Sequence, residues 1–374
     1  MRVDWVIVGA GFTGCTLAER IASQLGETVL VIERRRHVAG NAFDYYNEHG
    51  HLVHKYGPHV FHTNSREVWE YLSQFTEWRP YYHRVVAVVQ GKQVPLPFNL
   101  ESLQQLFPAR LANIFERRLV SEFGYGARVP VLRLLEHSDK VLRSLGQYVY
   151  ERVFLGYTIK QWGLRPEELD PSVTGRVPIV VSRDCRYFQD CFQAVPSLGY
   201  TALFLRMLSH ANIRVLLGAD YRDVREDIHF RKGLVYTGPI DEFFDYKHGA
   251  LEYRSIRFEF VTLDEPMHQK VATVNYPEDY NFTRVTEMKH ITGQQARKTT
   301  LIREYPERYE PGANEPYYPV PRPENRERYN LYAEDARRLG RSVVFAGRLG
   351  DYKYYNMDQA VARALKLFRD LAKM

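Results

Sequence analysis

The chain has 374 residues, of which 45% are hydrophobic and 26% charged, and this length predicts a folded globular protein of two or three domains. Its formal net charge of +6 arises from Lys and Arg residues scattered among acids, which argues against a nucleic-acid surface and suits small anionic substrates. No apolar run approaches the roughly 20 residues of a membrane span, no secretion signal precedes the first strand, and the three cysteines lack metal-site spacing, so we expect a cytoplasmic protein with reduced thiols.

The N-terminal segment has the pattern of a dinucleotide site. Residues 6–8 predict a buried strand, and three glycines follow it at once: Gly9, Gly11 and Gly14. Glycines at this spacing let the backbone turn sharply near a pyrophosphate and let the next helix pack closely on the strand. A second strand over 28–32 leads to Glu33, whose carboxylate suits a ribose hydroxyl. This order of elements predicts that a dinucleotide binds here, and a tight turn without a ligand is the alternative.

The next segments predict loops, one helix and a hairpin. Residues 37–47 and 56–62 are expected to be loops, and Asn64 with Glu67 forms a plausible capping box for a helix. Strands are expected over 85–89 and 94–96, and helical periodicity dominates the chain from there to about residue 163.

The second half of the chain returns to the first sheet. A polar loop is expected over 174–187, then a helix from Gly199 and strands over 213–217 and 234–236. Alternating residues over 255–305 predict antiparallel sheet. A last strand over 343–346, followed by Gly347 and a helix, would place a second helix N-terminus beside the first, an arrangement that suits a flavin.

The predicted fold class is therefore α/β, an FAD-binding Rossmann-like domain with an inserted helical-bundle domain and an antiparallel β-sheet domain. The expected boundaries are 1–82, 190–240 and 342–374 for the FAD-binding domain, 98–165 for the helical domain, and 83–97, 166–189 and 241–341 for the sheet domain.

Several residue clusters could carry chemistry. Phe154, Tyr157 and Trp162 could stack a nucleobase, although a small core between helices explains them equally well. Two loop arginines, Arg176 and Arg284, could grip a diphosphate. His59 and His62 have a spacing that could hold a metal, but no third ligand lies nearby, so no metal site is expected. Motifs of hydrolases, NTPases and metalloenzymes are absent from the sequence.

The chain resembles the prokaryotic UDP-galactopyranose mutases over essentially its whole length. The matching segments are VGAGFTG, AGN, YGPHVFHT, GYTIKQWG, YTGPIDEFFDY, EPYYPV and GRLGDYKYYNMD. The resemblance implies an FAD-dependent isomerase that interconverts UDP-galactopyranose and UDP-galactofuranose without net redox change. It also implies that reduced FAD is the active form and that its N5 attacks the anomeric carbon, so that no protein nucleophile is needed.

The resemblance also implies roles for individual residues. The implied catalytic residues are Arg176, Arg284 and His62. Arg176 and Arg284 would act on the diphosphate, Arg176 from a mobile loop, and His62 or His59 would lie against the flavin. The implied cofactor-binding residues are Gly9, Gly11, Phe12, Gly14, Glu33, Arg34, Gly40, Asn41, His59, Gly347, Arg348, Asn356 and Met357. The implied substrate-binding residues are His83, Phe154, Tyr157, Thr158, Trp162, Arg176, Tyr187, Asn275, Arg284, Tyr318, Tyr354 and Asn356, with Tyr317 as the alternative to Tyr318. Asn356 and His83 depart from the residues of many relatives, and we expect altered affinity there.

The expected partners are the two UDP-sugars, NAD(P)H or another reductant, and a second copy of the chain in a homodimer, with a role in galactofuranose biosynthesis for cell wall polysaccharide. Nucleic acid and a membrane span are not expected. Two other functions are considered: a flavin amine oxidase-like oxidoreductase, which would consume oxygen, and a nucleotide-sugar-binding module in which flavin is only structural.

Overall fold

The computed structural model describes residues 2–170 and 178–373, and the chain divides into two compact units. Unit 1 comprises Met1–Tyr81, Asp190–Tyr253 and Pro311–Met374, and unit 2 comprises Tyr82–Gln189 and Arg254–Glu310. Each unit therefore combines segments that are far apart in the sequence.

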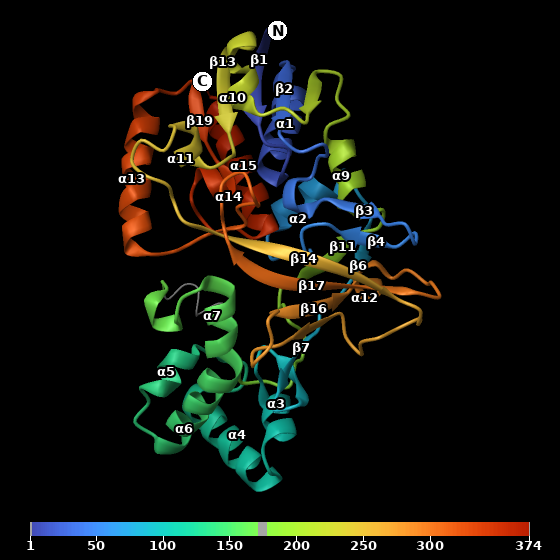
Figure 1. Cartoon of the computed structure of the whole chain (residues 1–374), viewed down its shortest axis with the longest axis vertical. Coiled ribbons are helices and arrows are strands. Elements are labelled where there is room, and N and C mark those ends of the chain that lie inside the picture. Colours follow the sequence, from blue (N-terminus) through green and yellow to red (C-terminus); the bar gives the residue numbers. More distant parts are fainter. Residues whose placement is uncertain (1, 171–177, 374) are drawn as a thin grey trace. The chain divides into compact units, whose positions relative to one another are not determined.

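Unit 1 is built on a parallel sheet with the strand order β12-β2-β1-β13-β19 (Figure 1). The strands are β1 (Arg2–Val8), β2 (Val29–Glu33), β12 (Ile213–Leu217), β13 (His229–Tyr236) and β19 (Val343–Phe345). Every neighbouring pair is parallel. The sheet thus takes strands from the beginning, the middle and the end of the chain, which confirms the Rossmann-like α/β prediction.

Helices cover this sheet and supply the core of unit 1. Ile7 of β1 packs with Leu17 and Ile21 of α1 (Phe12–Leu25) and with Val361 and Leu365 of α15 (Met357–Leu371), all of them buried. The other helical elements are α2 (Arg66–Ser73), α9 (Gly199–Met207), α10 (Tyr221–Val224), α11 (Ile240–Phe243), α13 (Pro323–Arg338), α14 (Gly347–Gly350), η1 (Gly40–Ala42) and η4 (Arg225–Asp227). The short strands are β3 (Asp44–Tyr46), β4 (Leu52–His54), β5 (Phe61–Thr63), β6 (Trp78–Pro80), β11 (Phe192–Pro196) and β18 (Tyr318–Pro319).

Two local expectations in unit 1 are wrong. Helix α2 is capped by Ser65, whose side chain accepts from the N–H of Val68, and not by Asn64. Asn64 instead donates to Asp190 and accepts from the N–H of Cys191, so its side chain is taken by a segment distant in sequence. The segments expected to be loops are the second: residues 37–47 contain η1 and β3, because β3 finds an antiparallel partner in β4, and residues 56–62 run into β5, which pairs with β11.

Unit 2 contains a mixed sheet in which β14, β17, β16, β15, β7 and β8 follow one another. These strands are β14 (Tyr253–Leu263), β17 (Thr299–Arg308), β16 (Arg284–Glu287), β15 (Thr273–Asn275), β7 (Val85–Val89) and β8 (Lys92–Leu96). The pairs are antiparallel as expected, except that β15 runs parallel to β7. No hairpin joins those two strands, which are distant in sequence, so their relative direction is not set by a turn.

The helices of unit 2 confirm the predicted helical block. The block consists of α3 (Leu100–Leu106), α4 (Ala109–Phe123), α5 (Val131–Leu135), α6 (Lys140–Val149), η2 (Tyr150–Leu155) and α7 (Gly156–Trp162), with the short strand β9 (Arg128–Val129) inside it and η3 (Pro166–Glu168) after it. Two expectations outside the block are wrong in part: α12 (Met288–Thr292) interrupts the segment expected to be sheet, and β10 (Ile179–Val180) lies in the segment expected to be a loop, where it pairs with β9. Figure 1 shows α3 to α7 gathered together in teal and green. Within residues 2–170 and 178–373, no helix is long and apolar enough to cross a membrane.

Candidate functional site

A pocket of unit 1 lies at the carboxyl ends of the parallel strands. It is lined by the last residues of three strands, Val8, Glu33 and Tyr236, and by residues that follow β12 and β19. Open parallel sheets bind their ligands at this edge. All of the cofactor-binding residues expected from the sequence line this one pocket: Gly9, Gly11, Phe12, Gly14, Glu33, Arg34, Gly40, Asn41, His59, Gly347, Arg348, Asn356 and Met357.

The three glycines of the first turn serve different purposes. A Cβ on Gly9, where φ is +102°, would lie 2.1 Å from Oγ1 of Thr237, and a Cβ on Gly14 would lie 1.9 Å from the carbonyl oxygen of Gly9. Both residues must therefore be glycine for the protein itself to pack. A Cβ on Gly11 would meet nothing nearer than Cα of Gly40 at 3.9 Å. The protein does not require glycine at position 11, so space for a ligand is the remaining physical reason for it.

Helix α1 presents a bare N-terminus to the same pocket. Its N-cap is Gly11, no side chain of the described residues caps it, and its first turn holds no acidic residue. Phe12, Thr13 and Gly14 of this first turn all line the pocket. Unsatisfied N–H groups and the positive end of the helix dipole favour an anion such as a phosphate.

Glu33 is held in a fixed orientation at the end of β2. Its Oε2 accepts from the N–H of Ala10 at 2.9 Å, and its Oε1 accepts from the N–H of Arg35 at 2.9 Å. A carboxylate at this position, oriented by the backbone, suits a ribose hydroxyl. Arg35 is anchored in turn by Glu315 at 2.7 Å and by stacking over the ring of Tyr56.

The other side of the pocket is formed by the segment between β19 and α15. Asn356 is the N-cap of α15, its N–H donates to Oε1 of Gln359 at 3.0 Å, and Asn356 also lines the pocket. Arg348 donates to the carbonyl oxygens of Tyr317 at 3.2 Å and Tyr355 at 2.8 Å. These bonds fix the guanidinium beside the pocket.

Tyr318 and Tyr354 form a stacked pair next to Arg348. Their ring centroids are 5.0 Å apart with an interplanar angle of 19°, and the guanidinium carbon of Arg348 lies 5.6 Å and 5.3 Å from the two centroids. Tyr317 is only 4% exposed, and burial raises the pKa of its phenol. Half-buried Tyr318 is therefore the better placed of the two neighbours to meet a ligand.

The two histidines of the 56–62 segment have different surroundings. His59 lines the pocket, and burial lowers its pKa to about 3, so its imidazole is neutral at physiological pH. Its Nδ1 lies 2.8 Å from the carbonyl oxygen of Gly57. His62 is not among the lining residues, and its Nδ1 lies 2.8 Å from Oδ2 of Asp190. Among the described residues, no cluster of His, Cys, Asp and Glu side chains could hold a metal.

Unit 2 places two of the expected substrate residues directly opposite each other. Asn275 ends β15, Arg284 begins β16, and the two are cross-strand partners, so Arg284 lies in a strand and not in the expected loop. Nε of Arg284 lies 3.0 Å from Oε2 of Glu304, which is buried and whose pKa is raised by that burial. Oδ1 of Asn275 is buried and bonds to no described residue. A buried acceptor without a donor is costly, which marks this place as one where a ligand could donate.

The aromatic residues expected to contact substrate lie on one helical run of unit 2. Phe154 belongs to the π-helical segment η2, and Tyr157, Thr158 and Trp162 belong to α7, in which Thr158 and Trp162 are neighbours at a spacing of four residues. Phe154 is 9% exposed and packs in the unit's core, whereas the other three are half-buried. Of the residues expected to contact the nucleobase, Phe154 is thus buried, whereas the three residues of α7 are accessible to a ligand.

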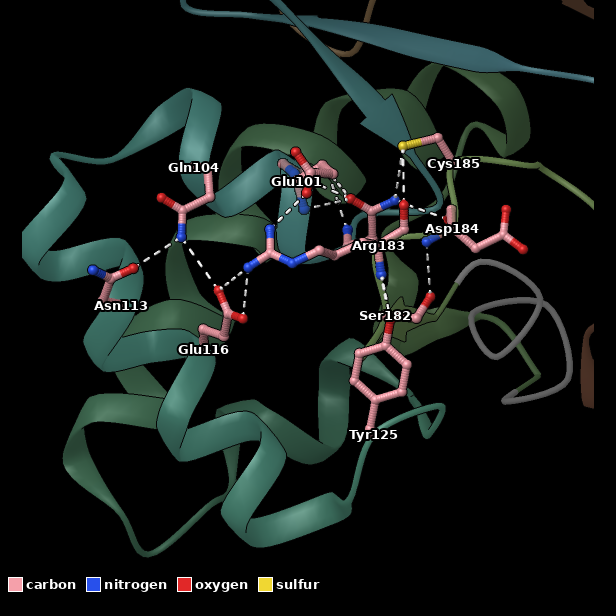
Figure 2. A network of polar contacts seen from close by, with 11 residues as sticks. Glu101, Gln104, Asn113, Glu116, Tyr125, Ser182, Arg183, Asp184 and Cys185 are labelled. Carbon is pink, nitrogen blue, oxygen red and sulfur yellow. Dashed lines mark hydrogen bonds and ion pairs between the residues drawn. The ribbon is translucent and has the colours of Figure 1, made fainter.

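His83 and Tyr187 are also brought together in unit 2. Their ring centroids are 5.8 Å apart, and the N–H of Tyr187 donates to the carbonyl oxygen of His83. Figure 2 shows how the segment before Tyr187 is anchored: Arg183 reaches Glu101 of α3 at 2.6 Å and Glu116 of α4 at 2.7 Å. Arg183 thus joins the segment before Tyr187 to α3 and α4.

The expected substrate residues are divided between the units. Tyr318, Tyr354 and Asn356 belong to unit 1, and His83, Phe154, Tyr157, Thr158, Trp162, Tyr187, Asn275 and Arg284 belong to unit 2. Arg176 lies outside the described residues.

Some residues around the pocket were not found from the sequence. Asp220 and Thr237 follow the ends of β12 and β13 and line the pocket. Because both strands were predicted, the rule that ligands bind at carboxyl ends would have found these two. The contact between Asp190 and His62 could not be predicted from the sequence, because the two residues are distant in the chain and only the fold brings them together.

Comparison with known proteins identifies close relatives. A family model described as UDP-galactopyranose mutase matches residues 152–354, and one described as NAD(P)-binding Rossmann-like domain matches residues 7–75. A probable UDP-galactopyranose mutase of Klebsiella pneumoniae is 37% identical over 96% of this chain and 92% of its own length. A dTDP-fucopyranose mutase of Escherichia coli is 33% identical over 96% of both chains.

Solved structures agree on the fold. A reduced UDP-galactopyranose mutase superposes with a TM-score of 0.75 at 16% identity, covering 100% of this chain and 94% of the other. A putative protoporphyrinogen oxidase from Exiguobacterium superposes with a TM-score of 0.65 at 13% identity, covering 100% and 99%. At these identities the likeness concerns the fold alone.

Proposed function

Because the chain belongs to the UDP-galactopyranose mutase family of FAD-dependent isomerases, we propose that it interconverts UDP-galactopyranose and UDP-galactofuranose. The 37% identity to the Klebsiella relative over nearly the whole chain carries this proposal. A homodimer, reduction by NAD(P)H, and a cytoplasmic role in galactofuranose biosynthesis for the cell wall belong to the same proposal.

The pocket of unit 1 fits FAD. The free space at Gly11 and the uncapped N-terminus of α1 suit the pyrophosphate, and Glu33 suits the adenosine ribose. The segment from Gly347 to Met357 would hold the flavin end, with His59 as a neutral neighbour. When bound and reduced, the flavin supplies a nucleophilic nitrogen, N5, for the anomeric carbon of the sugar.

The residues of the chain would then hold the rest of the substrate. Arg284 and Arg176 would bind the diphosphate, and Tyr318 and Tyr354 would donate to it from their hydroxyls. Phe154 and Tyr157 would hold the uracil ring by stacking. Such contacts keep UDP in place while its bond to the sugar breaks and reforms, so that the same diphosphate oxygen can return to the anomeric carbon. Aromatic walls would also keep water away from the activated sugar.

The buried Oδ1 of Asn275 supports a polar ligand beside Arg284. A carboxamide oxygen accepts a hydrogen bond from a hydroxyl or an N–H, and a guanidinium binds phosphate, so the pair suits a nucleoside diphosphate sugar. This feature does not by itself choose the nucleotide or the sugar.

A second candidate substrate is a dTDP-6-deoxyhexose. The Escherichia coli relative at 33% identity is named for dTDP-fucopyranose, and it covers this chain as fully as the Klebsiella relative does. An oxidoreductase resembling the flavin amine oxidases has less support, because it rests on fold likeness at 12% identity.

The test is conversion of UDP-galactofuranose by the FAD-loaded protein, with and without dithionite, followed by chromatography. Free FAD with dithionite is the control. We expect UDP-galactopyranose only in the reduced sample that contains protein. No product under reducing conditions contradicts the proposal, and conversion of dTDP-fucofuranose alone selects the second candidate.

A further inference from the structure

Lys160 of α7 reaches across to the turn that joins β15 to β16. Its Nζ donates to the carbonyl oxygens of Tyr276, Glu278, Tyr280 and Phe282, the last three at 2.9, 3.1 and 3.2 Å. These are alternate residues of the turn, so their carbonyl oxygens converge on one ammonium group. An ammonium has three N–H donors, which the four acceptors must share.

The same turn joins two residues of the candidate substrate site. Asn275 immediately precedes it and Arg284 follows Thr283 at its end, and a bond from the N–H of Tyr276 to the carbonyl oxygen of Thr283 closes it. Within the turn, the rings of Tyr276 and Tyr280 pack with their centroids 4.8 Å apart, and Oε2 of Glu278 accepts from the N–H of Gln90 at 2.9 Å. Because Asn275 and Arg284 directly flank the turn, the position of the turn bears on theirs.

Helix α7 is fitted to this turn at its first residue as well. A Cβ on Gly156 would lie 2.3 Å from the carbonyl oxygen of Pro277. At the other end of the helix, Arg254 of β14 donates to the carbonyl oxygens of Gln161 at 3.0 Å and Lys160 at 3.2 Å. The helix that carries Tyr157 and Trp162 is thus fixed to the sheet on both sides of Lys160.

The charge state of Lys160 suits this role. Burial lowers its pKa to about 8, so the amine is partly dehydrated but remains an ammonium at neutral pH. Carbonyl oxygens replace the lost water, as they do for buried cations.

We propose that Lys160 is a positioning residue for the nucleotide-sugar site, because it sets the spacing between α7, which carries Tyr157 and Trp162, and the Asn275–Arg284 pair. The inference rests on the proposed function, in which these two groups of residues bind the same substrate. Lys160 does not itself have to touch the substrate. All the contacts involved lie within unit 2.

The test compares Lys160→Met, Lys160→Arg and the control Lys140→Met in the FAD-loaded protein. Lys140 is an exposed lysine at the start of α6, in the same unit.

Calorimetry gives the Kd for UDP, and turnover of UDP-galactofuranose gives kcat and KM. For Lys160→Met we expect Kd and KM to rise about tenfold or more, with an unchanged flavin spectrum, because small misplacement of binding groups weakens their combined action. Lys160→Arg should recover only part of the loss, since a planar guanidinium cannot place one nitrogen among four carbonyls.

Gly156→Ala perturbs the packing of α7 against the same turn through Pro277, a different contact from that of Lys160, and does so without changing charge. It should raise the Kd for UDP in the same direction, and it carries the test if Lys160→Met fails to fold. If Lys160→Met folds, unchanged Kd and KM in this variant would overturn the inference. If Lys160→Met does not fold, an unchanged Kd in Gly156→Ala would do so. Failure of the proposed function is recognised separately, because the wild-type protein would then neither bind UDP nor convert the sugar.

Discussion

The Gly11→Ala substitution tests whether glycine is needed at position 11 for binding a ligand or for folding of the protein. The new methyl group would meet nothing in the protein nearer than 3.9 Å, and the backbone of Gly11, with φ −87° and ψ −173°, is one that alanine adopts. We therefore expect the free energy of unfolding of the FAD-free protein to change by no more than about 1 kcal/mol.

Binding of FAD should respond much more strongly. The methyl group would occupy the space before the N-terminus of α1, where the pyrophosphate would approach the N–H groups. Loss of two charge-assisted hydrogen bonds at about 1.5 kcal/mol each weakens binding by about 3 kcal/mol, or roughly a hundredfold in Kd. Flavin fluorescence titration of the stripped protein measures the Kd, and urea unfolding of the same preparation measures the stability.

Gly14→Ala is the contrasting variant. Its Cβ would lie 1.9 Å from the carbonyl oxygen of Gly9, so it should destabilise the FAD-free protein by about 1–3 kcal/mol. Two results would refute the reasoning: wild-type FAD affinity in Gly11→Ala, or a loss of stability in Gly11→Ala as large as that in Gly14→Ala.

Three further predictions concern unit 2. Arg284→Ala should abolish turnover while the flavin absorbance spectrum stays unchanged, and retained turnover would remove Arg284 from the site. Burial alone would raise the pKa of Glu287, but hydrogen bonds from His290, Thr299 and two backbone N–H groups outweigh it and lower the pKa to about 2. The Glu287 carboxylate therefore stabilises the fold fully above about pH 4.5, and up to about 3 kcal/mol of this stabilisation is lost as the pH falls towards 2. The Thr299→Val substitution removes one hydrogen-bond donor to this carboxylate. Acid unfolding of the variant should therefore begin at a higher pH than that of the wild type. Arg183→Met should lower the free energy of unfolding by about 1 kcal/mol at low ionic strength and by less in 1 M NaCl. Salt screens these ion pairs because Arg183 and its partners are partly exposed. An equal loss at both salt concentrations would contradict an ionic origin.

Much of unit 1 could be predicted because its signals are local. The glycine turn, the second strand and Glu33 follow from short segments with strong conformational preferences, and the late strands follow from apolar runs of strand length. The cap of α2 was misplaced by one residue because Asn64 and Ser65 are both good caps, and only the distant Asp190 decides between them.

The supports of the site could not be predicted in the same way. Lys160 reads in the sequence as an ordinary helical lysine, and its four carbonyl partners lie more than a hundred residues further along the chain. The parallel pairing of β15 with β7 is equally non-local. Sequence patterns predict which elements form, whereas such contacts depend on how the elements come together.

In the proposed function, the protein isomerises a nucleotide sugar without net consumption of electrons. The most direct test reduces the bound flavin once, removes excess reductant and oxygen, and follows both the flavin absorbance and the conversion of UDP-galactofuranose. We expect many equivalents of UDP-galactopyranose per flavin while the flavin stays reduced. Reoxidation of the flavin in step with at most one equivalent of product would contradict it and indicate an oxidoreductase.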